Sequence, residues 1–200
     1  MNNGQRLVLF DFDGTLTRKD TLFEIAKYVH GLRRFYVGMI ELSYYCFLYK
    51  VGLAPNWKTK ERILSHFFGG VTYDFFQRQC NRFVEDKLLS LLRKDAMEKL
   101  MTLKQNGAEI VIVSASAENW IKPWCDRLGI ACIATKLEVE NKKLTGKIAG
   151  KNCYGEEKVK RIKQEVRLSR YNAIYAYGDS KGDLPMLRLA THSYYRAFHE

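Results

Sequence analysis

The sequence of 200 residues has few of the features that mark disordered, secreted or zinc-stabilised proteins. It has only three prolines and no low-complexity tract, so its composition does not indicate disorder. The apolar stretch near the start covers four residues, which is too short for the core of a signal peptide. An odd number of scattered cysteines indicates a reducing compartment, so we expect a cytoplasmic location, with peripheral membrane contact as an alternative. None has C-x-x-C or zinc-ligand spacing: Cys46, Cys80, Cys125, Cys132 and Cys153.

Acidic side chains are also in short supply. The 22 Asp and Glu residues face 33 Lys and Arg residues, which gives a net charge of +11 that is spread along the chain. Such a charge attracts phosphorylated metabolites, anionic lipid surfaces or nucleic acid, although an ordinary basic surface explains it equally well. The chain has no aromatic-glycine RNA motif and no zinc-finger spacing, so we expect no specific nucleic-acid partner.

Hydrophobic patterning predicts strands that alternate with helices. A first strand is expected at about 6–11, and helical spacing then continues through 21–31, 33–51, 57–68, 72–86 and 88–105. Further strands are predicted at 108–113, 130–135, 173–177 and 193–198, with a hairpin at 137–148. Further helices are predicted at 117–128, 156–168 and 184–190, and we expect Pro123 to kink or divide the first of these.

This order of elements predicts the domain organisation. Strands that alternate with helices favour an α/β fold with a parallel sheet, which binds ligands at its C-terminal edge. Residues 1–16 and 101–200 are predicted to form this core. Residues 17–100 are predicted to form a helical cap domain that is inserted between the first two core strands and covers the edge.

Two acids stand at the end of the first strand. Asp11 and Asp13 flank Phe12 directly after an apolar run, although Asp is depleted in strands and a buried carboxylate is costly without a partner. A polar turn is the ordinary explanation, but a turn seldom needs two acids around an aromatic residue. Asp179 and Asp183 follow a later strand, where a glycine turn with a capped helix is the alternative. Four acids at one edge repel one another unless a cation lies among them, and their oxygens favour Mg²⁺ over zinc.

Two further elements carry residues suited to binding phosphate. Ser114 and Ala115 follow the second core strand, where a hydroxyl and backbone N–H groups could hold a phosphate at a helix N-terminus. Lys158 begins a charged helix. Each of these residues also has an ordinary explanation, since a serine after a strand is often a helix cap and a lysine-rich helix usually presents a solvated face. Taken together with the acids, the set fits phosphoryl transfer, in which Asp11 attacks phosphorus and Asp13 moves protons. Mg²⁺ and Lys158 would neutralise the phosphoryl oxygens, and Ser114 would orient the group.

The chain resembles the phosphatases of the haloacid dehalogenase (HAD) superfamily, because four segments match the four motifs of that superfamily in order. The segments are Asp11-Phe12-Asp13-Gly14-Thr15, Val111-Ile112-Val113-Ser114, Lys158 and Gly178-Asp179-Ser180-Lys181-Gly182-Asp183. The helical insertion after the first motif is similar to that of the phosphoserine-phosphatase-like branch, subfamily IB. The resemblance implies a Rossmann-like parallel sheet core, the HAD fold, with an inserted α-helical cap.

The resemblance also implies roles for the site residues. Asp11 would be the nucleophile and Asp13 the acid/base. Mg²⁺ would be held by the Asp11 carboxylate, the Asp13 backbone carbonyl and Asp179, with Asp183 supporting it. The implied function is a Mg²⁺-dependent phosphomonoester hydrolase that acts through an aspartyl-phosphate intermediate on a small phosphorylated metabolite or a lipid phosphate. A phosphotransferase to an alcohol acceptor and a non-catalytic phosphate-binding regulatory protein are the alternatives.

The predicted cap bears on the substrate and on the partners. Asp20 stands where phosphoserine phosphatases carry a Glu that meets the substrate ammonium, and Gly182 replaces their usual Asn, which weighs against phosphoserine. The segment 35–49 is unusually aromatic, but its 15 residues include a Glu and are too few to span a bilayer. Because Arg33 and Arg34 precede it, the segment could rest on an anionic membrane and admit a lipid phosphate. Packing inside the cap or against a second subunit is the favoured interpretation, since an aromatic stripe at helical spacing usually belongs to a core.

Overall fold

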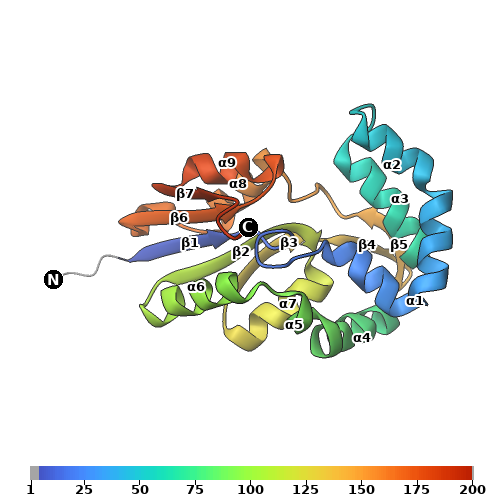
Figure 1. Cartoon of the computed structure of the whole chain (residues 1–200), viewed down its shortest axis with the longest axis horizontal. Coiled ribbons are helices and arrows are strands. Elements are labelled where there is room, and N and C mark those ends of the chain that lie inside the picture. The colour runs from blue at the N-terminus through green and yellow to red at the C-terminus, as the bar shows by residue number, and fades with distance from the viewer. Residues whose placement is uncertain (1–4, 200) are drawn as a thin grey trace.

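A five-stranded parallel sheet forms the centre of the molecule in the computed structural model, which describes residues 5–199 (Figure 1). The strands lie in the order β3-β2-β1-β6-β7. Their bounds are β1 Arg6–Phe10, β2 Glu109–Ala117, β3 Ala131–Thr135, β6 Ala173–Gly178 and β7 His192–Tyr195. Neighbouring strands pair in parallel, so their carboxyl ends meet at one edge, and the predicted α/β fold with a parallel sheet is confirmed.

Helices cover both faces of this sheet. Alternate residues of β1 point to opposite faces, so that Val8 and Phe10 join one hydrophobic cluster while Leu7 and Leu9 join another. Because β1 is buried on both faces, its sequence is a continuous apolar run. In Figure 1 one pair of helices lies below the sheet and the other above it: α6 Lys94–Gln105 with α7 Glu118–Leu128, and α8 Glu156–Glu165 with α9 Leu184–Leu189.

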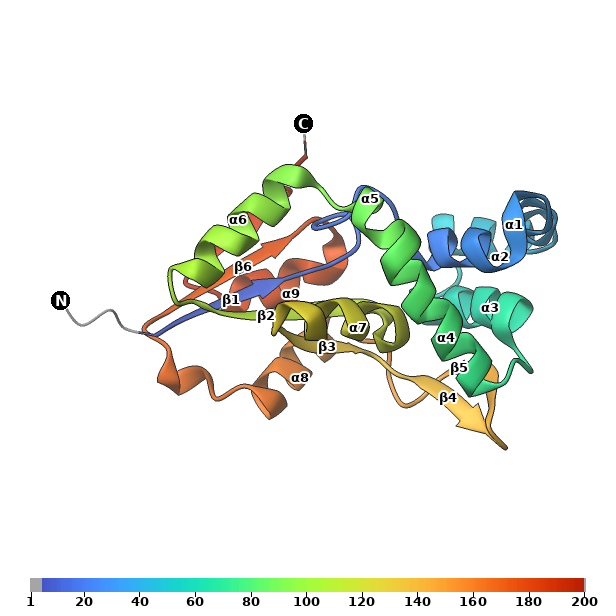
Figure 2. The same cartoon turned by 90° about the horizontal axis from the view of Figure 1, so that it is seen from below.

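A block of helices follows β1 in the sequence and lies at one end of the sheet (Figure 2). Its bounds are α1 Thr21–Glu41, α2 Ser43–Lys50, α3 Asn56–Phe68, α4 Tyr73–Phe83, a π-helical turn Val84–Leu88 and α5 Leu89–Leu91. The chain enters and leaves this block side by side. Thr17 forms a β-bridge with Leu92, and the Arg18 amide donates to the Leu91 carbonyl at 2.8 Å. These two paired segments connect the inserted helices to the sheet.

The predicted helix end at Gly31 is confirmed, because Gly31 leaves the helical conformation (φ 76°, ψ 161°) and divides α1 into two helical segments. Two other predicted helices in this block have wrong bounds. The predicted helix 33–51 is interrupted at Leu42, which separates α1 from α2. The predicted helix 88–105 is interrupted at Leu92, whose backbone is extended (ψ 142°). Within residues 5–199 no helix has the length and apolar character needed to cross a bilayer, as predicted for the aromatic segment.

Helix α7, predicted at 117–128, runs from Glu118 to Leu128 with Pro123 inside it, so the proline does not divide it. A proline lacks the N–H that would bond to the carbonyl four residues earlier, here that of Asn119. The Gln77 side chain of α4 donates to this carbonyl at 2.8 Å. The missing bond is thus replaced from outside the helix.

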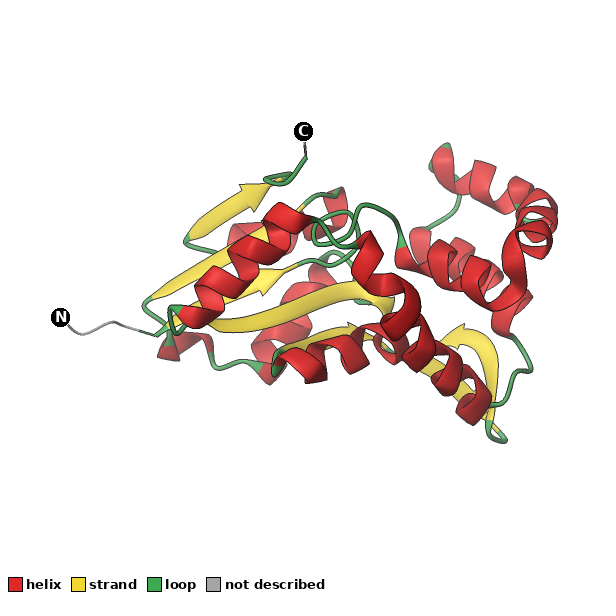
Figure 3. Ribbon diagram, turned by 60° about the horizontal axis from the view of Figure 1, so that its bottom comes forward, coloured by secondary structure: helices red, strands yellow, loops and turns green. Residues whose placement is uncertain are grey.

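The predicted hairpin at 137–148 forms a separate two-stranded sheet, β4 Leu137–Glu140 and β5 Lys143–Ile148. Asn141 and Lys142 both have positive φ, 47° and 61°, as a tight two-residue hairpin turn requires. The hairpin packs on α3 and reaches beyond the main sheet (Figure 3). Gly146 permits this contact, because its φ is +83° and a Cβ there would lie 2.3 Å from the Cα of Ser65.

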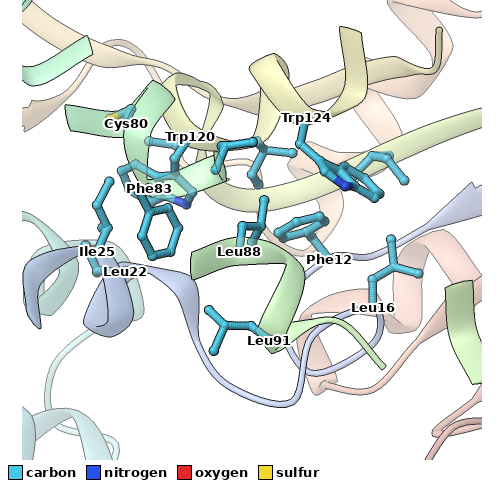
Figure 4. Close-up of a cluster of buried hydrophobic side chains, with 14 of the residues drawn as sticks. Phe12, Leu16, Leu22, Ile25, Cys80, Phe83, Leu88, Leu91, Trp120 and Trp124 are labelled. Atoms are coloured by element: carbon cyan, nitrogen blue, oxygen red, sulfur yellow. The ribbon is translucent and has the colours of Figure 1, made fainter. Parts of the chain in front are cut away.

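A shared hydrophobic cluster joins the inserted helices to the sheet (Figure 4). Phe12 and Leu16, from the loop after β1, meet Phe83 and Leu88 of the inserted block and Trp124 of α7. The rings of Phe12 and Trp124 pack edge to face with their centroids 5.3 Å apart. Phe12 therefore turns away from the two acids that flank it, and its burial anchors the loop that carries them.

Candidate active site

The predicted site residues come together at the carboxyl edge of the sheet. The strand ends supply most of them, α8 supplies the lysine, and the residue before α1 supplies one acid. They line a single cleft of about 480 Å³ at the junction of the sheet and the inserted helices: Asp11, Asp13, Asp20, Ser114, Ala115, Lys158, Asp179 and Asp183. The convergence follows from the parallel strands, whose carboxyl ends share one edge.

Lys158 is a fixed cation at the base of this cleft. It is fully buried, and its Nζ donates to Oδ1 of Asp11 and of Asp183 at 2.6 Å each and to the Val113 carbonyl at 2.7 Å. An ammonium group has three protons, and each has an acceptor here. Burial lowers the pKa of Lys158, but the two carboxylates outweigh it and hold that pKa above its ordinary value. The lysine is therefore not part of a solvated helix face.

Asp183 uses both of its carboxylate oxygens within the protein. While Oδ1 accepts from Lys158, Oδ2 accepts from the Ser180 hydroxyl at 2.7 Å and from the Ser180 backbone N–H at 2.9 Å. Burial raises the pKa of Asp183, but Lys158 and the Ser180 hydrogen bonds outweigh it, and the net pKa lies below its ordinary value. Asp183 thus fixes both the lysine and the turn after β6.

Asp11, Asp179 and Asp183 form an acidic cluster. One carboxylate oxygen from each lies within 4.8 Å of the others. Burial raises the pKa of Asp11 well above its ordinary value, and burial together with the charge of Asp183 raises that of Asp179. Gly14 keeps the cluster open, because its φ is +84° and a Cβ there would lie 2.2 Å from Oδ2 of Asp179. Three carboxylates beside one lysine, offering oxygen donors, fit a hard cation such as Mg²⁺.

The start of α1 orients Asp13. Its Oδ1 accepts from the Thr21 backbone N–H at 2.7 Å and from the Thr21 hydroxyl at 2.6 Å. The Trp120 indole N–H donates to the same hydroxyl at 2.9 Å, so the arrangement is fixed from a second side. The sequence analysis missed both Thr21 and Trp120 in this role. Asp20 lies at the cleft as the N-cap of α1, where it accepts from the Leu22 N–H at 2.9 Å.

Ser114 lies in a bulged strand end. Its hydroxyl oxygen accepts from the Ser116 backbone N–H at 3.0 Å, and its side chain is buried. The predicted strand end at residue 113 is wrong, because β2 continues to Ala117 with a shift of register, whereas the helix predicted from residue 117 begins at Glu118 as α7. A bulge releases backbone groups from the strand ladder and bends the strand. Residues 114–116 therefore meet the cleft from a strand end rather than from a helix.

Lys60 of α3 is a site residue that the sequence analysis missed. It is buried, with 8% of its surface exposed, and it lines the same cleft. Its Nζ donates to the Ala115 carbonyl and, at a distance of 3.3 Å, to Oδ1 of Asn152. These bonds link the inserted helices to the sheet edge. Burial lowers the pKa of Lys60 to about 8, against the opposing effect of the Asp20 and Asp13 charges.

Comparisons with known proteins agree on one family. The sequence model of the haloacid dehalogenase-like hydrolases matches residues 8–188. The protein CicA of Caulobacter vibrioides is 34% identical over 204 residues, which cover 99% of this chain and 89% of that protein. A probable phosphatase of Mycobacterium tuberculosis is 30% identical over 194 residues, which cover 92% of this chain and 66% of that protein.

A solved structure has the same fold. A phosphoserine phosphatase, solved as an analogue of its phospho-aspartyl intermediate, superimposes with a TM-score of 0.70 at 21% identity, over 96% of this chain and 86% of that chain. Fold and family model together define a hydrolase of the α/β class. The chain belongs to the haloacid dehalogenase-like hydrolase family.

Proposed function

We propose that this protein is a Mg²⁺-dependent phosphomonoester hydrolase that forms an aspartyl-phosphate on Asp11. The observation that carries the proposal is the setting of this carboxylate, which is 6% exposed and opens into the cleft. Lys158 holds its Oδ1 at 2.6 Å, and the Thr15 hydroxyl donates to its Oδ2 at 3.2 Å. Membership of a hydrolase family and the phosphoserine phosphatase fold support the same assignment.

Two displacements at phosphorus account for the reaction. In the first, an Asp11 oxygen bonds to phosphorus, the bond to the leaving oxygen breaks, and Asp13 donates a proton to that oxygen. In the second, Asp13 takes a proton from water as the water oxygen bonds to phosphorus. The bond between Asp11 and phosphorus then breaks, which restores the carboxylate and releases inorganic phosphate. Thr21 fixes the orientation of the Asp13 carboxylate, since its N–H and hydroxyl both donate to one Asp13 oxygen.

We infer that the Asp11 and Asp179 carboxylates and the Asp13 backbone carbonyl would hold Mg²⁺, with Asp183 beside them. The oxygen donors within 4.8 Å of one another and the raised pKa values of Asp11 and Asp179 support this inference. When bound, Mg²⁺ neutralises charge on the phosphoryl oxygens. Because Asp183 already accepts from Lys158 and Ser180, its part is to hold the surrounding residues.

The phosphate group would lie between Lys158 and the bulged end of β2. Lys158 offers a permanent positive charge, and the Ser114 hydroxyl and Ala115 backbone N–H offer donors from the cleft wall. All of these groups act by position, since phosphoryl transfer depends chiefly on orientation and charge stabilisation. The presence of every motif residue at the cleft weighs against a purely regulatory protein.

The space at the cleft suggests the substrate class. A second cavity of about 1000 Å³ shares Asn56 and Tyr154 with the 480 Å³ cleft. This room supports a small phosphorylated metabolite or a lipid phosphate whose leaving group is larger than serine. Lys60 and Asp20 reach the cleft from the inserted helices, and we propose that they contact the leaving group.

Domain roles and location are part of the same proposal. We propose that the sheet with α6 to α9 is the catalytic core and that the inserted helices α1 to α5 form a cap that selects the substrate; the boundary expected at residue 100 divides α6, which lies on the sheet. The five cysteines are free, which supports a reducing, cytoplasmic compartment.

A panel of phosphomonoesters tests the proposal. The full chain is assayed on p-nitrophenyl phosphate, on phosphorylated metabolites and on phosphatidic acid, with and without EDTA. We expect hydrolysis that EDTA removes and excess Mg²⁺ restores, together with a higher melting temperature in Mg²⁺, because a bound cation relieves the repulsion among the acids. Added alcohols identify a phosphotransferase, since less inorganic phosphate than leaving alcohol would then appear. An absence of turnover on the whole panel in Mg²⁺ would contradict the proposal.

A further inference from the structure

The second half of α1 has one face that belongs to the hydrophobic core. Phe35, Gly38 and Leu42 are buried, and they recur at the three- and four-residue spacing of one helix face. The Phe35 ring stacks on that of Phe67 in α3, with the centroids 5.7 Å apart. The expectation that the aromatic segment packs inside the inserted block therefore holds for this face.

The opposite side of the same helices is apolar but exposed. Leu32, Tyr36 and Ile40 lie at four-residue spacing on α1, and after the break at Leu42 Tyr44, Phe47 and Val51 follow at three- and four-residue spacing in and directly after α2. We name these six residues the outer apolar row; each is between 49% and 72% exposed. Single exposed apolar residues are common on proteins, but a row at helical spacing is a contiguous apolar surface, and such surfaces mark interaction sites.

Basic residues flank the outer apolar row in the sequence. Arg33 and Arg34 are exposed at its start and Lys50 at its end. Further along, Lys58 lies over the ring of the exposed Trp57, with its Nζ 5.5 Å from the ring centroid. Between residues 32 and 58 the sequence has four basic side chains and a single acid. Tyrosine and tryptophan with arginine and lysine are the side chains that favour the interface of an anionic bilayer.

A second copy of the chain fits this surface less well than a membrane does. In a two-fold dimer the same patch meets a second copy of itself, so the interface would contain the Arg33–Arg34 pair twice with only Glu41 of each copy to offset it. The net charge of +11 makes two copies of the chain repel each other, whereas an anionic surface attracts both the arginine pair and the chain as a whole. Charge complementarity thus selects lipid over self-association.

We propose that the outer apolar row, with Arg33, Arg34 and Lys50, docks the protein on an anionic lipid bilayer. The depth of contact is that of an interfacial helix, which inserts apolar side chains at the level of the head groups. Cys46 and Tyr49 of α2 line the candidate cleft, so docking would bring the mouth of that cleft to the membrane. The docking is independent of catalysis, while the consequence, access to lipid phosphates, rests on the proposed phosphatase function.

Vesicle co-sedimentation of the full chain tests the docking. Vesicles of phosphatidylglycerol and phosphatidylcholine are compared with vesicles of phosphatidylcholine alone, and we expect at least tenfold stronger binding to the anionic ones. The double variant Ile40→Ser/Phe47→Ser should lower binding to anionic vesicles at least tenfold, since it removes two large apolar side chains from the interface. The double variant Arg33→Glu/Arg34→Glu should also lower binding to anionic vesicles. Leu89→Ser, which removes an equally exposed leucine outside the row, should bind like the wild type.

Two controls separate the docking from folding and from catalysis. The row variants should keep wild-type hydrolysis of soluble p-nitrophenyl phosphate, because Ile40 and Phe47 do not line the cleft. An inactive Asp11→Asn variant should still sediment with anionic vesicles, so a failure of the proposed function leaves the docking test intact. Equal binding to neutral and anionic vesicles, or full binding by Ile40→Ser/Phe47→Ser, overturns the proposal. A wild-type dimer that Ile40→Ser dissociates, without vesicle binding, would identify a second copy as the occupant and also overturn it.

Discussion

The catalytic edge of the sheet and the outer side of α1 and α2 both hold side chains in unfavourable surroundings, but of opposite kinds. At the edge, Lys158, Asp11 and Asp183 are buried and paired, because Lys158 donates to both carboxylates and to a backbone carbonyl. On the outer side, large apolar groups such as Ile40 and Phe47 are exposed to solvent. A buried charge tolerates little change in its surroundings, whereas an exposed side chain tolerates a great deal.

The difference indicates a division of labour. The edge determines the reaction, because its residues are held by hydrogen bonds from four separate elements. We propose that the inserted helices select what reaches the edge, through Lys60 inside the cleft and through the outer apolar row. Substitutions at the edge should therefore affect rate and stability most strongly, and substitutions in the inserted helices should affect binding with smaller effects.

Asp11→Asn should have the largest effect. An amide cannot attack phosphorus, so kcat on p-nitrophenyl phosphate should fall on the order of 10⁴-fold or more. Asp95→Asn, an exposed acid on α6, is the matched control and should retain wild-type activity. An Asp11→Asn variant with more than a tenth of wild-type activity would remove Asp11 from the role of nucleophile.

Lys158→Met should lower both activity and stability. Removing one partner of a buried ion pair leaves charge without compensation, which costs about 3–5 kcal/mol of unfolding free energy. Urea denaturation measures this loss. Lys160→Met, an exposed lysine two residues along the same helix, should change stability by less than about 0.5 kcal/mol. Equal stabilities of the two variants would contradict the description of Lys158 as a buried, triply paired cation.

Much of the catalytic edge could be predicted from the sequence, because its logic is local. A strand of apolar residues that ends in Asp11 and Asp13 places both acids at the carboxyl end of that strand, and parallel strands bring their ends together. The same reasoning brought Ser114 and Asp179 to the cleft. The strand predicted to end at residue 113 is longer because a bulge extends β2 to Ala117, and a run of small residues does not indicate a bulge.

The contribution of the inserted helices could not be predicted, because it depends on packing between distant segments. Lysine side chains are ordinarily solvated, so the sequence did not distinguish Lys60 from the other lysines. Its position on the apolar face of α3, with Ile63 and Leu64, was the one sign that it is buried. Pro123 stays within a helix because Gln77 from another helix supplies a hydrogen bond. The hydrogen bonds from Thr21 to Asp13 likewise became visible only in three dimensions.

Thr21→Val should have an intermediate effect. The variant removes the hydroxyl that donates to Asp13 and keeps the shape of the side chain, so kcat should fall about tenfold, the value of one hydrogen bond to a charged group. Thr21→Ser keeps the hydroxyl and should recover most of the activity. If Thr21→Val and Thr21→Ser lose activity equally, packing rather than the hydrogen bond explains the effect.

Lys60→Met should have the smallest effect and should act on binding. Loss of a cation that contacts the leaving group should raise KM about fivefold with little change in kcat, which corresponds to about 1 kcal/mol. The control is Lys58→Met, since Lys58 lies on the same helix but is exposed, and its KM should match the wild type. A lower kcat with an unchanged KM would instead assign Lys60 to the chemistry at the edge.

The most direct test of the central claim is the detection of phosphate bound to Asp11. The Asp13→Asn variant is mixed with p-nitrophenyl phosphate and Mg²⁺, quenched in acid and analysed by peptide mass spectrometry. The leaving group of this substrate needs no proton, so the first displacement proceeds, while hydrolysis is slow without the Asp13 base. We predict a phosphoryl group on the peptide containing Asp11 that hydroxylamine releases. A variant that turns over without any phosphorylated peptide, or that carries the phosphate on another residue, would contradict the account.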